Sequence, residues 1–262
     1  MAKLRRGEKL EPNTLEAWKP SAFIAQNPVF TLDELRAAYR HMGRDPRSAQ
    51  EIVSYYLAQG TLLLVRRGLY AHPTWVDPWR LASRLTPDAV IAYDGALSFH
   101  KLTGVGHSLH FASTRRTPRL NFNDILFDVV RVETLPPHET VSVNGDPVRV
   151  TSLERTLVDS LDRLDLSPDL KTLWNAFRSA PRVDPKKLLQ HLKKLNRGPL
   201  LASRLGLFME ARKEVDHDLS LALKNLALRA PAYFDRANRE KGMEIISRWN
   251  LIASDVLHEL SA

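Results

Sequence analysis

The sequence predicts an α+β protein, on three observations. The first quarter of the chain has two helical patterns followed by a strand-like hairpin pattern. Residues 75–165 mix strand and helix patterns, and residues 166–262 are mainly helical in pattern. We therefore expect one domain over residues 1–74 and a second over 75–262.

Composition excludes several classes of protein. The chain has 262 residues, of which 44% are apolar, 26% are charged and none is cysteine. This length buries enough surface to fold without disulfides or a structural metal, and the lack of cysteine removes thiolate zinc sites and cysteine nucleophiles. No apolar run approaches the ~20 residues of a spanning helix, and Met1–Leu10 lacks the apolar stretch of a signal peptide. We expect a cytoplasmic protein with no membrane partner.

The charge balance favours an anionic partner. There are 38 Lys and Arg against 30 Asp and Glu, a formal net charge of +8, which is typical of nucleic-acid binding but weak on its own. Residues 1–72 contain 11 basic and 7 acidic side chains, so we expect the positive excess to be concentrated in the amino-terminal quarter.

Two helices are predicted in this quarter. Thr31 and Glu34 form a capping box, so a helix begins at Leu32, and Gly43 ends it. A second helix over Arg47–Gln59 has one apolar face, while its other face is polar. An earlier helix between Thr14 and Gln26 would complete a three-helix core. The expected apolar core positions are Trp18, Phe23, Ile24, Leu32, Leu35, Ala38, Tyr39, Ala49, Ile52, Val53, Tyr56 and Leu57.

A β-hairpin pattern follows the second helix. Thr61–Val65 and Leu69–Ala71 read as strands, and Gly68 can take the positive φ that a tight turn needs. Helix, helix and a hairpin with arginines at its tip is the order of a winged helix-turn-helix. An α-helix fits the major groove of DNA, and a hairpin beside it can place guanidinium groups on phosphates or in the minor groove.

This order predicts a DNA interface. We expect the polar face of the second helix to lie nearest the bases and the arginines of the loop and hairpin to contact the backbone or minor groove. The same elements could instead form a protein-interaction domain. The candidate DNA-binding residues are Arg44, Arg47, Ser48, Gln50, Ser54, Tyr55, Arg66 and Arg67.

The middle of the chain has alternating elements and one strong turn signal. Asn144-Gly145 between two strand patterns predicts a hairpin, and Ser152 is placed to cap a helix. The expected helices are 78–85, 93–104 and 153–162, and the expected strands are 109–113, 125–132 and 140–150, while residues 89–92 are either a strand or the start of a helix.

The acidic residues of this region do not form a convincing catalytic set. Glu154 and Asp159 are five apart and do not share a helix face, so a surface pair between Arg155 and Asp159 is the better interpretation. No phosphate loop, nucleophile elbow or H-E-x-x-H run supports an acid–base set. We therefore expect no enzymatic activity, no metal and no cofactor.

The carboxy-terminal region reads as amphipathic helices. Asp184-Pro185 begins one of them, and Gly206 in a buried helix would let another helix approach. A basic cluster on the first of these helices is either a solvated face or a contact to nucleic-acid phosphates. Its residues are Lys186, Lys187, Lys193, Lys194 and Arg197.

Five segments in order resemble one family. They are the hairpin ending Arg66–Tyr70, the small-residue helix Tyr93–Gly104, Val150–Asp159, Ala202–Glu210 and Trp249–Ile252. Together they are similar to the AbiEi family of antitoxins, although here the chain continues helically through Ser254–Leu260, which departs from the family pattern.

The resemblance implies a transcriptional regulator. It would bind promoter DNA through the winged helix, repress its own toxin–antitoxin operon, and counter a nucleotidyltransferase-like toxin through its carboxy-terminal part, often without a stable complex. Two alternatives remain open. One is a nuclease or nucleotidyltransferase-like enzyme that docks through its winged helix, and the other is a winged helix that binds a protein.

Overall fold

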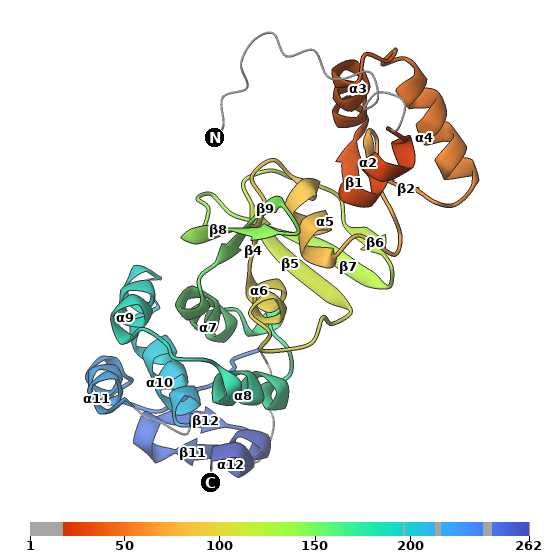
Figure 1. Ribbon diagram of the computed structural model, residues 1–262. Helices are drawn as coiled ribbons and strands as arrows, with labels where there is room; N and C mark the ends of the chain where they lie inside the picture. Colours follow the sequence, from red (N-terminus) through yellow and green to blue (C-terminus); the bar gives the residue numbers. More distant parts are fainter. Residues whose placement is uncertain (1–17, 196, 213–215, 238–242, 262) are drawn as a thin grey trace. The chain divides into compact units, whose positions relative to one another are not determined.

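The computed structural model describes residues 18–195, 197–212, 216–237 and 243–261, and the chain has an α+β fold (Figure 1). It divides into two units, residues 1–84 and 85–262. Residues 14–17 of the segment predicted to hold a helix between Thr14 and Gln26 lie outside the described residues, and so does the basic segment Met1–Leu10.

The amino-terminal unit has the element order of a winged helix-turn-helix. Its three strands form a small antiparallel sheet in the order β1-β3-β2. Because β2 and β3 are joined by the turn Arg67-Gly68, the wing is short. The elements are α2 Pro20–Gln26, β1 Val29–Thr31, α3 Leu32–His41, α4 Ser48–Ala58, β2 Leu63–Arg66, β3 Leu69–Ala71 and α5 Pro78–Leu85.

Local signals in the sequence explain these elements. The capping box at the start of α3 is formed in both directions: the Glu34 backbone N–H donates to Thr31 Oγ1, and Thr31 N–H donates to the Glu34 carboxylate at 2.7 Å. Gly68 has a φ of +78° in the wing turn. The predicted apolar stripes meet in one core, whose fully buried members include Ile24, Leu35, Tyr39, Ala49 and Val53.

The helix α5 is joined to the amino-terminal unit by polar contacts, which explains why the division falls after Arg84 and not at the predicted boundary of 74/75. Arg84 forms an ion pair with Glu34 of α3, and Arg66 of the wing donates to the Arg84 carbonyl at 3.3 Å. Glu34 therefore caps α3 and also ties α5 to it.

The carboxy-terminal unit contains a six-stranded mixed sheet in the order β6-β7-β5-β4-β9-β8. The pairs β5–β7 and β4–β9 are parallel and the other pairs are antiparallel. The predicted hairpin turn is present, with φ of +49° at Asn144 and +90° at Gly145. The strands are β4 Val90–Ile91, β5 Ser108–Ser113, β6 Leu120–Phe122, β7 Ile125–Arg131, β8 His138–Val143 and β9 Asp146–Thr151.

Helices continue the carboxy-terminal unit on one side of the sheet. Here α6 packs on β5, α7 packs on α6, and α9 and α10 pack on α7 (Figure 1). Gly95 permits the close approach of α6, since a Cβ there would lie 2.6 Å from the His110 carbonyl oxygen. The helices are α6 Tyr93–Phe99, α7 Leu153–Asp162, η1 Leu164–Leu166, α8 Leu170–Ser179, α9 Pro185–Lys194, α10 Gly198–Met209, α11 His217–Leu226, η2 Ser247–Trp249 and α12 Asp255–Ser261.

Several details of this unit differ from the expectations. The helix expected over 93–104 ends at Phe99, and the strand β6 was not expected. A three-stranded sheet, β10-β12-β11, stands within the region predicted as mainly helical, with β10 Ala232–Tyr233, β11 Glu244–Ile246 and β12 Leu251–Ala253. The space left by Gly206 is filled by the Trp249 ring of the short 3-10 helix η2 and not by a second α-helix, because a Cβ there would overlap the carbons of that ring. The Arg155–Asp159 pair forms at 2.7 Å, but it is buried instead of lying on the surface.

Among the residues that the structure describes, no helix is both long enough and apolar enough to cross a membrane.

Candidate nucleic-acid interface

The outward face of α4 contains the polar residues expected nearest the bases. Gln50, Ser54 and Tyr55 are exposed, with Tyr55 58% exposed, and Ser48 is half-buried. Ser54 Oγ donates to the Gln50 carbonyl at 3.0 Å, so in this arrangement the hydroxyl offers a free acceptor rather than its proton. At about 100° per residue these side chains form one continuous arc opposite the buried Ala49 and Val53.

Two arginines lie in the turn between α3 and α4. Arg47 stands at the N-cap position of α4 and is exposed, and its backbone N–H donates to Asp45 at 2.9 Å. The Arg44 guanidinium lies 5.3 Å from the centre of the Trp18 ring, which holds this side chain against the unit by a cation–π contact. Both guanidinium groups remain on the exposed side.

The two wing arginines differ in their surroundings. Arg67 occupies the turn itself and is exposed. Arg66 is the last residue of β2, after a register irregularity in the ladder, and donates to the Arg84 carbonyl. Because an arginine has five N–H donors, this single bond leaves donors for a phosphate while fixing the direction of the side chain.

An open cleft of about 650 Å³ brings α3, α4 and the wing together. Gln50 and Arg67, which are far apart in the sequence, both line it. Arg36 of α3 also lines it and pairs with Asp33 at 3.1 Å on the surface. The cleft is therefore lined by one side chain suited to reading a base edge and by two guanidinium groups suited to phosphates, and the acidic Asp33 lines it too.

Arg36 belongs to this surface, although the sequence alone does not indicate it. Arg36 was hidden because the polar side of α3 gives no sign of which residues approach the wing. Glu51 is exposed beside Gln50 on α4, where a carboxylate would repel phosphates yet can accept a hydrogen bond from a cytosine amino group.

A second basic surface lies on α9. Lys186, Lys187, Lys193 and Lys194 are all exposed on one side of this helix. The fifth expected member, Arg197, is exposed too, but it lies beyond the helix and pairs with Asp162 at 3.2 Å. We call the four lysines the α9 lysine face.

Along the sequence, the positive excess is larger in residues 170–209, which include α9, than in the amino-terminal quarter, and this corrects the expectation from residues 1–72. Residues 170–209 contain nine Lys and Arg and a single acidic residue, Asp184, whose carboxylate caps α9. This stretch by itself accounts for the formal net charge of +8.

One titratable set is brought together that the sequence did not indicate. Asp94 accepts hydrogen bonds from the His110 backbone N–H at 2.8 Å and from Ser108 Oγ at 2.9 Å, and lies 2.9 Å from His110 Nδ1. His100 takes no part in this set, because its Nε2 lies 2.8 Å from the Thr151 carbonyl oxygen. Burial lowers the pKa of His110, but the bond and charge of Asp94 outweigh it and raise that pKa above its ordinary value.

This set ties α6 to β5 rather than forming a nucleophile system, because Ser108 donates to the carboxylate and not to the imidazole. Across the described ranges, no group of three or more His, Asp or Glu side chains is placed to hold a metal ion.

Comparison with known proteins identifies a shared fold. No protein-family model matches the chain, and no curated protein shows a significant sequence match. Among solved structures, the chain is similar to the RV2827C protein from Mycobacterium tuberculosis, with a TM-score of 0.62 and 16% identity. The match covers 91% of this chain and 92% of that one. At 16% identity this similarity shows a shared fold only, so the function has to be argued from the candidate site.

Proposed function

We propose that this protein is a DNA-binding autorepressor with antitoxin activity, as its resemblance to the AbiEi family implies. In this proposal α4 enters the major groove, with Arg47, Ser48, Gln50 and Ser54 nearest the bases. Arg44, Arg66 and Arg67 contact the DNA backbone or minor groove, and the exposed Tyr55 of α4 is a further DNA contact. The carboxy-terminal unit counters a nucleotidyltransferase-like toxin without itself being an enzyme.

The observation that supports this proposal best is the cleft shared by α3, α4 and the wing. Gln50 lies there with Arg36 and Arg67 on the same exposed surface. Base-reading and phosphate-binding side chains must reach one duplex at the same time, so their presence around one cleft favours DNA over a small-molecule ligand.

The experiment is a titration of the protein against the DNA directly upstream of its own gene and against unrelated DNA of equal length, at two salt concentrations. We expect tighter binding to the upstream fragment, by a factor of ~10³ or more at physiological salt. Equal and weak binding to both fragments would remove autorepression from the proposal.

The antitoxin activity is tested separately, by co-expression with the product of the adjacent gene. We expect the full chain to rescue growth. If the variant with both Arg66 and Arg67 replaced by Ala also rescues growth, neutralisation is assigned to the carboxy-terminal unit. Failure of the wild-type chain to rescue growth would remove the antitoxin function and leave the DNA-binding proposal standing.

One observation favours the protein-interaction alternative. Leu63 and Leu64 of β2 are 39% and 58% exposed, and exposed apolar side chains on an outer strand are typical of a surface that another chain covers. The salt dependence of binding distinguishes DNA binding from protein binding. DNA affinity falls steeply with added salt, whereas the affinity of an apolar protein interface changes little.

A further inference from the structure

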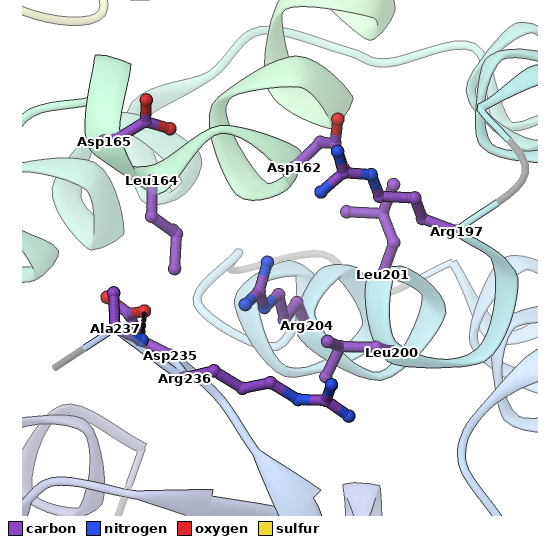
Figure 2. A pocket seen from close by; sticks show the side chains of 10 residues that line it. All are labelled: Asp162, Leu164, Asp165, Arg197, Leu200, Leu201, Arg204, Asp235, Arg236 and Ala237. Atoms are coloured by element: carbon purple, nitrogen blue, oxygen red, sulfur yellow. Dashed lines mark hydrogen bonds and ion pairs between the residues drawn. The ribbon is translucent and has the colours of Figure 1, made fainter. Parts of the chain in front are cut away.

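A pocket of about 520 Å³ in the carboxy-terminal unit has no part in the proposed DNA contacts (Figure 2). It is formed by the end of α7 and η1, the first turns of α10 and the segment after β10. Figure 2 shows apolar and charged side chains around one space. The lining residues are Asp162, Leu164, Asp165, Arg197, Leu200, Leu201, Arg204, Asp235, Arg236 and Ala237.

Arg204 is the unusual residue of this pocket. It is only 9% exposed, its Nη1 donates to the Leu161 carbonyl at 2.7 Å, and its Nη2 donates to the Phe234 carbonyl. Its Nε is buried with no hydrogen-bond partner among the described atoms. Both partners are neutral carbonyls, so within the described part of the chain this buried cation has no carboxylate at ion-pair distance. Burial of a cation without a counter-ion is costly.

The carboxylates around Arg204 are engaged elsewhere. Asp162 pairs with Arg197 at 3.2 Å, and Asp165 accepts two bonds from Arg163, at 2.7 and 2.8 Å. Asp235 accepts the Ala237 backbone N–H at 2.9 Å. Burial lowers the pKa of Arg204, and the charges of Asp235 and Asp162 only partly oppose this. Within the described residues, these carboxylates therefore act on this guanidinium only from beyond ion-pair distance.

A further feature of the pocket favours an anion. Arg236 lies on its wall and is exposed. Leu164 of η1 and Leu200 and Leu201 of α10 form the apolar part of the lining.

We propose that this pocket binds a phosphorylated small molecule of the size and class of a nucleoside monophosphate. The phosphate contacts Arg204 and Arg236 and supplies a counter-charge at ion-pair distance. The ring lies against Leu164 and Leu200. The volume falls in the usual range for small-molecule sites.

The test uses the full-length protein and isothermal titration calorimetry with the four ribonucleoside monophosphates, the corresponding nucleosides and inorganic phosphate. We expect at least one monophosphate to bind, and to bind more tightly than inorganic phosphate and than its own nucleoside. Loss of one charge-assisted hydrogen bond in Arg236→Gln should weaken binding about tenfold or more.

The control is Arg229→Gln, which removes an exposed arginine outside the pocket and should leave the affinity unchanged. Arg204→Gln should abolish binding. Because that change affects a buried residue, Arg236→Gln keeps the test decisive if Arg204→Gln does not fold. Absence of binding by all probes at millimolar concentration, equal binding of phosphate and monophosphates, or unchanged affinity in Arg236→Gln would each overturn the proposal.

Discussion

At the scale of single residues, a substitution of Gln50 distinguishes base recognition from sequence-independent attraction to DNA. It lines the same cleft as Arg36 and Arg67, and an uncharged amide contributes little to counter-ion release. We predict that Gln50→Ala weakens binding to the upstream DNA by about 1–3 kcal/mol, with binding to unrelated DNA and the salt dependence unchanged. Competition binding measures both. An equal loss on specific and unrelated DNA would contradict a base-reading role.

His110 gives a prediction about pH. Asp94 contacts it directly, and Asp128 and Asp165 also face it with charges that raise its pKa. Because the pKa is raised in the folded state, its stabilising contribution is complete below the unfolded value of about 6.5 and is lost as the pH rises through the folded value. We therefore predict that His110→Asn reduces the free energy of unfolding more at about pH 5.5 than at about pH 8.5.

Denaturant unfolding at the two pH values measures this difference. The exposed His217 of α11 provides the matched control, His217→Asn. A loss for His110→Asn that is equal at both pH values would show that the residue stabilises the fold by packing alone.

At the scale of elements, the packing of α10 against η2 depends on one missing side chain. The Trp249 ring is 1% exposed and is held by a bond from its Nε1 to Glu210 at 2.8 Å, so it has little room to move. We predict that Gly206→Ala destabilises the carboxy-terminal unit by about 1–3 kcal/mol or more, as overpacking does.

Thermal unfolding of Gly206→Ala and of Gly104→Ala makes the comparison, since a Cβ at Gly104 meets nothing within 4 Å. Equal midpoints for the two variants would contradict the packing described for Trp249.

The α9 lysine face is also tested as an element. We predict that replacing its four lysines by Gln weakens binding to unrelated DNA. The slope of log K against log salt should fall by about 0.9 for each phosphate that the lysines no longer neutralise. The fold should be retained because all four side chains are exposed. An unchanged slope would show that these lysines face solvent and contact no DNA phosphates.

Local signals were enough to predict most elements, but they did not predict the long-range pairing of strands. The capping box of Thr31 and the Asn144-Gly145 turn act within a few residues, so the sequence indicates them directly. The strand β6 was missed because its turn, Asn123-Asp124, has no glycine and nevertheless has φ of +51° and +60°. The parallel pairing of β5 with β7 and the contact of Asp94 with His110 depend on tertiary packing, which periodicity does not encode.

The candidate site shows the same contrast between local signals, which the sequence indicates, and long-range contacts, which it does not. The arginines of the wing and the polar face of α4 could be predicted from helical spacing and a turn. Arg36 could not, because its place beside Gln50 and Arg67 arises only when α3 packs against the wing. The pairing of Arg197 with Asp162, from a different helix, likewise removed one residue from the expected basic cluster.

At the scale of the whole molecule, the central claim is that the winged helix holds DNA through Arg66 and Arg67. The most direct measurement is the salt dependence of binding to the upstream DNA for the wild type and for the double variant Arg66→Ala/Arg67→Ala. The control is Arg115→Ala/Arg116→Ala, an adjacent exposed arginine pair in the carboxy-terminal unit. We predict that the wing variant binds all DNA sequences more weakly and that its slope falls by the equivalent of about two phosphates, while the control keeps the wild-type slope. An unchanged slope in the wing variant, or an equal fall in both variants, would contradict the claim.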